Sequence, residues 1–417
     1  MHNFKFKNNE LCCEGVKISS IARKVGTPFY LYSQKAFVER CNSIKKAFKE
    51  VTPIICFAVK SNNNLSVLKT LKDLGAGFDI VSLGELKKVL KVGADASKIA
   101  FASVGKTEEE IRAALKASIL FFNVESEPEL VRINEIAKQL KKKAPVALRI
   151  NPDVDAATHK SITTGTLKNK FGIDLKTTKN ILTNQKKYPH INFKGLHIHI
   201  GSQITTIDPF VNAIKKVTVF IKTLEANEIE LEYFDIGGGM GISYDGKKTP
   251  SASDFAKKIV PLLKKTGLKI VLEPGRFISG NSGVFVTKSL YLKDNGVKKF
   301  LIVDGGMSDL IRPTLYQAHH EIVPVKKTSA KKIKVDIVGP ICESGDYFAK
   351  DRNFPRVKDG DLIAIKSAGA YGHVMASNYN VRPKPAEIMA KGSKWAIVRK
   401  KESFEDLIKN EKIPSII

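Results

Sequence analysis

The feature that most constrains the fold is a regular alternation of short apolar runs and amphipathic helical patterns between residues 54 and 274. The apolar runs are rich in β-branched and aromatic residues, which is typical of buried strands. Eight of them follow one another, at residues 54–59, 77–82, 98–103, 119–124, 145–151, 193–200, 232–237 and 269–274. Eight strands separated by helices predict a closed (β/α)8 TIM-like barrel, with a doubly wound open sheet as the alternative.

Beyond about residue 280 the helical pattern fades and strand patterns replace it. Four strand-like runs are expected there, at residues 284–294, 298–306, 332–339 and 361–372. We therefore predict an α/β protein with a (β/α)8 barrel over residues 31–280 and a mostly-β domain over residues 281–417. The N-terminal segment 1–30, which contains short β-like pieces, is expected to join the two domains.

The composition limits the classes of partner. Lys and Arg outnumber Asp and Glu by 69 to 42, and the formal net charge of +27 can mark binding to nucleic acids or anionic membranes. The lysines, however, are spread along amphipathic helical patterns, without a basic tail or a nucleic-acid-binding motif. We therefore predict a solvated, lysine-rich surface with some attraction for acidic small molecules, and no nucleic-acid partner.

Targeting and cysteine signals predict a cytoplasmic protein. No apolar run approaches the length of a transmembrane helix, and the N-terminus lacks the apolar core of a signal peptide, so no membrane association is expected. The cysteines form neither an even disulfide framework nor a Cys-x-x-Cys pair; they are Cys12, Cys13, Cys41, Cys56 and Cys342. A reducing compartment fits this pattern.

The strand ends of the predicted barrel carry unusual residues. Catalytic groups of such barrels gather at the C-terminal ends of the strands. Lys60, Asp79, His199, the glycines 237–239 and Glu273 occupy those positions here. Partial burial would lower the pKa of Lys60 and make its amine available for Schiff-base chemistry with a carbonyl compound. The alternative for Lys60, common at isolated strand ends, is a side chain that reaches out to water.

Two motifs offer ligands of different kinds. His197 and His199 share one face of an expected strand, where a histidine either satisfies hydrogen bonds in the core or stacks on a flat ligand. No third metal ligand is evident, so no metal site is predicted. The glycines 237–239 allow backbone amides to converge on an anion, for which a single phosphate is the natural ligand. A tight turn would explain one of these glycines, but three less easily.

The remaining motifs carry acidic, basic and thiol groups. Glu273 is expected to point into the barrel mouth, and Arg276 to hold a carboxylate or phosphate, unless the two form a surface ion pair. Cys342 lies among acidic groups that raise a thiol pKa and usually leave it inert, but a neutral thiol is the form that donates a proton. Arg312 and Tyr316 are expected on one face of a turn or short helix.

Taken together, these motifs resemble those of the group IV decarboxylases that use pyridoxal 5′-phosphate, and among them the diaminopimelate decarboxylase family. The resemblance covers nearly the whole chain and rests on AVKSN (58–62), HIHIGSQ (197–203), GGGMG (237–241), EPGR (273–276), CESGD (342–346) and AYG (370–372). Residues 159–173 resemble the family's Thr-Gly…Lys-Phe-Gly segment, whereas Ser61 stands where many relatives have alanine. The resemblance implies the alanine-racemase-like architecture, fold type III.

The resemblance implies how the barrel serves pyridoxal 5′-phosphate. Lys60 would bind the cofactor covalently, His199 would stack on its ring, and Glu273 would keep the pyridine nitrogen protonated, which favours decarboxylation over racemisation. The other residues expected around the cofactor are Asp79, Ser202, Gly238, Gly239, Pro274, Gly275, Arg276 and Tyr371.

The resemblance also implies a substrate. Decarboxylation of meso-2,6-diaminopimelate would give L-lysine and carbon dioxide, the last step of lysine biosynthesis. Arg276, Arg312 and Tyr316 would hold the far carboxylate of this amino acid. Glu343 would bind its far amine, and Tyr371 would lie at both the substrate and the cofactor.

Cys342 would protonate the carbanion, and in this family its segment enters the partner subunit's site, so a homodimer with shared active sites is expected.

Other substrates are the main alternatives. Ornithine and arginine decarboxylases share the barrel, but their substrates lack the far carboxylate that Arg312 and Tyr316 would bind. Carboxynorspermidine decarboxylase is the closer alternative, and assays with both substrates separate the two.

We predict that Lys60→Ala loses the visible absorbance of the lysine-bound cofactor and nearly all turnover, because no other amine replaces Lys60 at this position. Absorbance spectra, circular dichroism and a decarboxylation assay of the purified variant check this. A folded variant that decarboxylates at a rate comparable with the native protein would contradict the central role of Lys60.

Overall fold

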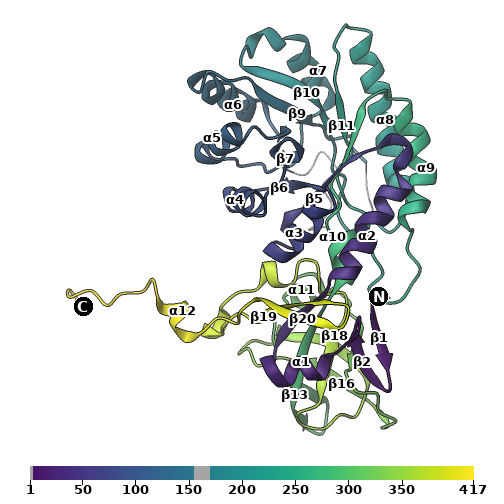
Figure 1. Ribbon diagram of the computed structural model, residues 1–417, viewed down its shortest axis with the longest axis vertical. Coiled ribbons are helices and arrows are strands. Elements are labelled where there is room, and N and C mark those ends of the chain that lie inside the picture. The colour runs from purple at the N-terminus through teal and green to yellow at the C-terminus, as the bar shows by residue number, and fades with distance from the viewer. Residues whose placement is uncertain (1–2, 155–169) are drawn as a thin grey trace. The chain divides into compact units, whose positions relative to one another are not determined.

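The computed structural model describes residues 3–154 and 170–417, which divide into two compact units (Figure 1). The barrel unit comprises Val38–Ile242 and Lys248–Ile278. The β unit comprises the chain up to Phe37, the short segment Ser243–Lys247, and Ser279–Ile417. Each unit has its own cluster of buried apolar side chains.

Eight parallel strands of the barrel unit close into a barrel in the order β10-β11-β12-β5-β6-β7-β8-β9. Their bounds are β5 Ile54–Ala58, β6 Gly77–Ile80, β7 Ile99–Phe101, β8 Phe121–Val124, β9 Ala144–Arg149, β10 Ile191–His197, β11 Tyr233–Asp235 and β12 Lys269–Leu272. The pairing of β12 with β5, in which Val271 lies opposite Ile54, completes the circle. The predicted (β/α)8 barrel is confirmed, the open sheet is excluded, and each strand overlaps one predicted run.

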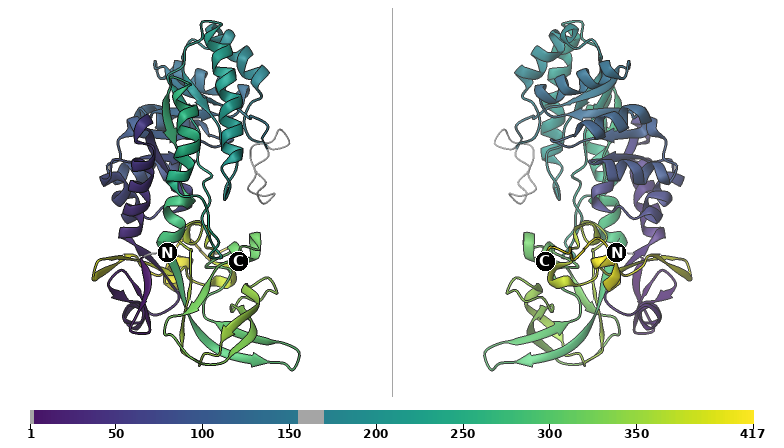
Figure 2. Two further views of the ribbon diagram at one scale, coloured as in Figure 1. Left: turned by 90° about the vertical axis from the view of Figure 1, so that its right-hand side faces the viewer. Right: turned by 90° about the vertical axis from the view of Figure 1, so that its left-hand side faces the viewer.

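Helices form a layer outside these strands (Figure 2). They are α2 Gln34–Ala47, α3 Leu65–Asp73, α4 Leu83–Lys91, α5 Glu108–Ala117, α6 Glu127–Gln139, α7 Leu175–Thr183, α8 Asp208–Glu225 and α9 Ala252–Lys264. The short helix α10 Arg276–Ser279 follows the end of β12. Local sequence sets several helix starts: Thr107 with Glu110 and Ser251 with Asp254 form capping boxes that satisfy the first amides of α5 and α9. Within residues 3–154 and 170–417, no helix has the length and apolar character needed to cross a membrane.

The barrel strands are buried on both faces, which explains their sequence pattern. Cys56, Ala100, Phe121, Ala147 and Val271, from five different strands, form one cluster of completely buried side chains. The sequences of strands covered on both faces are continuous apolar runs, without the alternation of apolar and polar residues that strands with one exposed face show. This is the pattern from which the eight strands were predicted.

The β unit is built on a nine-stranded sheet with the main path β17-β16-β14-β13-β4-β19-β20. The strands are β4 Phe29–Ser33, β13 Gly283–Asp294, β14 Lys299–Val303, β15 Ile322–Pro324, β16 Lys332–Val338, β17 Tyr347–Pro355, β18 Leu362–Ile365, β19 Ala386–Lys391 and β20 Lys394–Arg399. A small sheet and three helices complete the unit: β1 Phe4–Lys7, β2 Glu10–Cys13, β3 Val16–Lys17, α1 Ile18–Val25, α11 Arg312–Tyr316 and α12 Phe404–Ile408. The predicted mostly-β character of the C-terminal part is confirmed.

β4 lies in the middle of this large sheet. It pairs antiparallel with β13 and parallel with β19, and all five of its residues are buried. Its partners lie far along the chain, so the sequence showed an apolar run at this place but not its pairing. Strands β15, β17, β19 and β20 had no predicted counterpart; β17, for example, interrupts its apolar residues with Lys350–Asn353.

Candidate active site

Lys60 and Asp79 meet at the mouth of the barrel. The strand β5 ends at Ala58, one residue before the end of the run 54–59 expected from the sequence. Lys60 lies in the 3₁₀ turn that follows, Val59–Ser61. Its amine forms an ion pair with the Asp79 carboxylate on β6. The Asp79 side chain is completely buried, whereas 33% of the Lys60 side chain is exposed. The amine is therefore held by a buried carboxylate and remains accessible from solvent.

Glu273 follows β12 and is held by two neutral side chains. Its Oε1 accepts a hydrogen bond of 3.0 Å from Asn123 Nδ2 on β8, and its Oε2 lies 3.2 Å from Nε2 of His197 at the end of β10. Asp235 on β11 is the third neighbour, since potential ligand atoms of His197, Asp235 and Glu273 lie within 4.8 Å of one another. All these groups are buried. Both oxygens of Glu273 thus have fixed partners.

The carboxyl groups in this cluster divide into different protonation states. Burial, reinforced by the nearby Glu273 charge, raises the pKa of Asp235 well above its ordinary value, so Asp235 keeps its proton. Burial also raises the pKa of Asp79 to about 7, with Glu273 adding to this and Lys60 opposing it. For Glu273 burial acts in the same direction, but His197 and Lys60 outweigh it and lower its pKa overall. Glu273 is therefore the firmly ionised member.

Glu273, His197 and Asp235 also have the spacing of metal ligands, although the sequence predicted no metal site. A metal ion would require Asp235 to lose its proton and would compete with the hydrogen bonds that Glu273 already accepts. Burial keeps the pKa of His197 below its ordinary value, so the imidazole is neutral and donates Nε2–H to Glu273. This donor set is suited to holding an ionised carboxylate.

His199 and the glycine run pack against one another. β10 ends at His197, so His199 lies beyond the strand rather than on its face, and its Nδ1 accepts a hydrogen bond of 3.2 Å from Gly238 N. Burial, with the charge of Arg149, lowers the pKa of His199 well below its ordinary value, which leaves a neutral ring. A Cβ on Gly238 would lie 2.2 Å from the Glu273 carbonyl oxygen, and one on Gly239 2.5 Å from the Gly201 carbonyl oxygen. Close backbone packing therefore requires these glycines.

A hydroxyl and a guanidinium group lie together beside the glycine run. Arg276, the first residue of α10, is buried, and its Nη2 donates a hydrogen bond of 3.0 Å to Ser202 Oγ. Gly275 packs closely on the Lys60 turn, because a Cβ there would lie 3.0 Å from Ala58 Cβ and 3.2 Å from Ser61 Oγ. The structure thus brings the predicted barrel residues to one set of strand ends, and Arg276 with Ser202 offers donors to an anion.

The other predicted site residues belong to the β unit. Arg312 and Tyr316 are the first and last residues of α11, on one helical face as expected. Cys342 is exposed in the loop between β16 and β17, where its backbone N–H donates to Asn380 Oδ1 at 3.0 Å. Glu343 follows, and a hydrogen bond to it raises the pKa of Tyr379.

Tyr371 has a backbone φ of 53°, in the left-handed region that non-glycine residues rarely adopt. A rare conformation of this kind at a predicted site residue is consistent with a functional constraint.

The predicted segment 159–173 lies outside the described residues except for its last four. Of these, Gly172 donates its N–H to Glu125 Oε2 at 3.0 Å, and Phe171 lies under the Arg149 guanidinium at 4.7 Å.

The sequence did not mark Asn123 or Asp235 as site residues, and for His197 it left open whether the ring satisfies hydrogen bonds in the core or stacks on a flat ligand. Asn123 and Asp235 are single polar residues inside apolar runs, a pattern that marks a buried polar group with a specific partner. That signal was present, but the partner of each residue was not visible before the barrel was closed.

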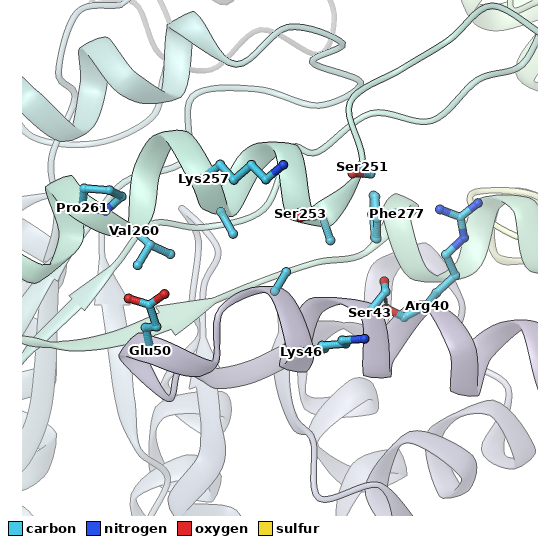
Figure 3. Close-up of a pocket in the computed structure, with 13 residues that line it drawn as sticks. Arg40, Ser43, Lys46, Glu50, Ser251, Ser253, Lys257, Val260, Pro261 and Phe277 are labelled. Atoms are coloured by element: carbon cyan, nitrogen blue, oxygen red, sulfur yellow. Dashed lines mark hydrogen bonds between the residues drawn. The ribbon is translucent and has the colours of Figure 1, made fainter.

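A separate cavity of about 660 Å³ lies between α2 and α9, on the outside of the barrel unit (Figure 3). Arg40 and Lys46 of α2 and Lys257 of α9 line it together with apolar side chains such as Val260. None of the predicted site residues lines this cavity, although Phe277, the neighbour of Arg276, does. The strand ends, with their perturbed carboxyl groups, are therefore the better candidate for the active site.

Comparison with known proteins identifies the family. Residues 34–280 match the pyridoxal binding domain of pyridoxal-dependent decarboxylases. The chain is 45% identical to the diaminopimelate decarboxylase of Aquifex aeolicus over 405 residues, which are 97% of this chain and 96% of the relative. It is 44% identical to that of Vibrio cholerae over 402 residues, 96% of each protein.

Solved structures agree with these relatives. The diaminopimelate decarboxylase of Helicobacter pylori complexed with L-lysine is 43% identical, with a TM-score of 0.91 over 94% of this chain and 98% of that chain. The enzyme from M. jannaschii, in co-complex with L-lysine, is 36% identical, with a TM-score of 0.94 over 99% of this chain and 98% of that chain. The chain therefore belongs to the pyridoxal-dependent decarboxylase family and, within it, to the diaminopimelate decarboxylases.

Proposed function

We propose that this protein decarboxylates meso-2,6-diaminopimelate to L-lysine and carbon dioxide, the last step of lysine biosynthesis. The observation that carries the proposal is the barrel mouth, where the Lys60 amine and an ionised Glu273 are each held by buried partners. Relatives of full length carry this function in their names, and a solved relative binds L-lysine. Both facts support the choice of substrate and product.

The barrel residues fit pyridoxal 5′-phosphate in charge and chemistry. When bound, the cofactor supplies an electron sink for the bond that breaks as carbon dioxide leaves. Lys60 supplies the amine for the cofactor aldehyde, and Asp79 keeps that amine in place. Glu273, ionised and held by Asn123 and His197, is the partner for a protonated ring nitrogen. The neutral ring of His199 is suited to stacking on a flat ligand.

The phosphate of the cofactor would bind where Ser202 and Arg276 provide donors. The glycine run is part of this proposed site. Gly238 and Gly239 pack so closely on neighbouring backbone that neither position has space for a side chain, and backbone amides of such a run can converge on an anion. Pro274, Gly275 and Tyr371 complete the proposed cofactor site.

The far end of the substrate would be recognised by paired charges. Arg312 and Tyr316 of α11, together with Arg276, would bind the far carboxylate, and Glu343 the far amine. Tyr371 would contact both substrate and cofactor. Diaminopimelate has an amine and a carboxylate at each end, so recognition at the far end needs one cationic and one anionic partner.

We further propose that the protein is a cytoplasmic homodimer, in which Cys342 protonates the carbanion in the partner subunit's site. The exposed position of Cys342 on a loop is consistent with a group that acts outside its own chain. The other four cysteines are buried and free, and free thiols suit a reducing compartment. On this proposal the barrel (31–280) supplies the cofactor chemistry and the β domain (281–417) supplies substrate recognition.

Glu273→Gln is expected to retain the cofactor but to slow decarboxylation roughly 100- to 1000-fold, because a neutral amide no longer holds the ring nitrogen protonated. Single-turnover rates measured on cofactor-loaded protein check this. Glu129→Gln is the matched control, since Glu129 is also a glutamate of the barrel unit with a mostly covered side chain, 8% exposed, but pairs with Lys106. Equal rates for the Glu273 variant and the native protein would remove Glu273 from this role.

Arg312→Met is expected to erode the selectivity for diaminopimelate over lysine as a substrate, because lysine decarboxylated at its α-carbon presents no far carboxylate. A hydrogen bond to a charged group contributes about 1.5–3 kcal/mol, so the ratio of kcat/KM values should fall about ten- to hundredfold. Assays with both amino acids measure the ratio. Efficient decarboxylation of lysine by the native protein would refute the substrate assignment.

Mixing Lys60→Ala and Cys342→Ala dimers under conditions of subunit exchange is expected to restore activity. Each mixed dimer would contain one site in which both native residues meet across the interface. Exchange is verified with differently tagged subunits, and each variant incubated alone is the control. Exchange without recovery of activity would place both residues in the same chain's site.

A further inference from the structure

The proposed substrate arginine, Arg312, is held by two aromatic side chains of the β unit. Its Nη1 lies 2.8 Å from Nε2 of His320, and its guanidinium carbon lies 4.5 Å from the ring centroid of Tyr244. The rings of Tyr244 and His320 meet edge to face at 5.2 Å. Arg312 is buried and His320 is completely buried. The plane of the guanidinium group is therefore fixed by a ring below it and a hydrogen bond at one edge.

The partners of His320 determine where its proton lies. Nδ1 of His320 is 2.7 Å from the carbonyl oxygen of Lys366, which only accepts hydrogen bonds, so Nδ1 carries the hydrogen. The Arg312 guanidinium only donates, so Nε2 of His320 must be the unprotonated acceptor. Both contacts are satisfied together only by neutral His320 with its hydrogen on Nδ1.

We propose that His320 is a positioning residue, which sets substrate specificity by aiming Arg312 at the far carboxylate. The inference rests on the proposed function in one respect, the role of Arg312 as the group that binds this carboxylate. A guanidinium group oriented before the substrate arrives loses less conformational freedom on binding, which strengthens recognition of the carboxylate without affecting the chemical step. Tyr244 supplies the surface on which the group lies.

Two isosteric variants of His320 separate its two contacts. The amide oxygen of Gln lies three bonds beyond Cβ, as Nε2 of His does, so the side chain of His320→Gln can still accept a hydrogen bond from Arg312. The amide nitrogen of Asn lies two bonds beyond Cβ, as Nδ1 of His does, so the side chain of His320→Asn can still donate to the Lys366 carbonyl but does not reach Arg312. His319→Gln is the matched control, because His319 faces Arg352 instead, at 3.4 Å.

L-lysine and 1,5-diaminopentane are the probes, because the proposed product L-lysine keeps the far carboxylate whereas the diamine has none. We expect His320→Asn to raise the inhibition constant of L-lysine and the KM for diaminopimelate about tenfold, with the constant for the diamine and kcat at saturation nearly unchanged. His320→Gln and His319→Gln should stay close to the native values. Equal behaviour of the Asn and Gln variants, or parallel weakening of L-lysine and the diamine, would overturn the inference.

Arg312→Met, measured beside these variants, separates the two claims. If it leaves the ratio of the L-lysine and diamine constants unchanged, the proposed role of Arg312 fails. If it changes the ratio and His320→Asn does not, only the inference about His320 fails. Should His320→Asn not fold, nitrogen NMR of the native protein with labelled histidine decides: hydrogen on Nδ1 of His320 and none on Nε2 supports the inference, and the reverse overturns it.

Discussion

The mouth of the barrel depends on how a buried cluster distributes its charge. The amine of Lys60 shares this region with the carboxyl groups of Asp79, Asp235 and Glu273. Several ionised carboxylates in a buried site would repel one another, and each would also lose its hydration at a large cost in free energy. Because its pKa is raised, Asp235 keeps its proton and carries no charge. Asp79 has a pKa of about 7, and the positive charge of Lys60 balances its negative charge when it is ionised. What remains is one firmly ionised carboxylate, Glu273, which Asn123 and His197 hold in place.

The backbone packing at the strand ends fixes the same groups. Gly238 donates its N–H to the ring of His199, and Glu273 donates its backbone N–H to the carbonyl of Gly237 at 2.8 Å. A side chain at Gly238 would displace the Glu273 backbone. The ends of β10, β11 and β12 are therefore locked together by the glycine run. A shift in this run would move the histidine and the carboxylate at the same time, so the glycines contribute to the site through geometry as well as through any contact with an anion.

The sequence predicted the elements of the site better than their connections. Lys60 and Glu273 were recognisable because charged residues follow apolar runs at barrel strand ends. Asn123 and Asp235 lie within their runs, and their role appears only when the barrel closes and brings β8 and β11 beside Glu273. The same limit applies to β4, whose apolar residues were visible but whose partners β13 and β19 lie far along the chain. Local patterns specify strands, whereas long-range pairing specifies which side chains meet.

The choice of a neutral partner for Arg312 has a physical advantage. A carboxylate beside this arginine would hold it equally well, but it would neutralise the charge and compete with the carboxylate of a substrate. His320 accepts one hydrogen bond without charge and is itself oriented by the Lys366 carbonyl. The guanidinium group thus keeps its full positive charge while its direction is set. Tyr244 adds attraction through its ring and likewise brings no negative charge to the site. Orientation and charge are in this way supplied by different groups, which is what the proposed recognition of a far carboxylate by Arg312 would require.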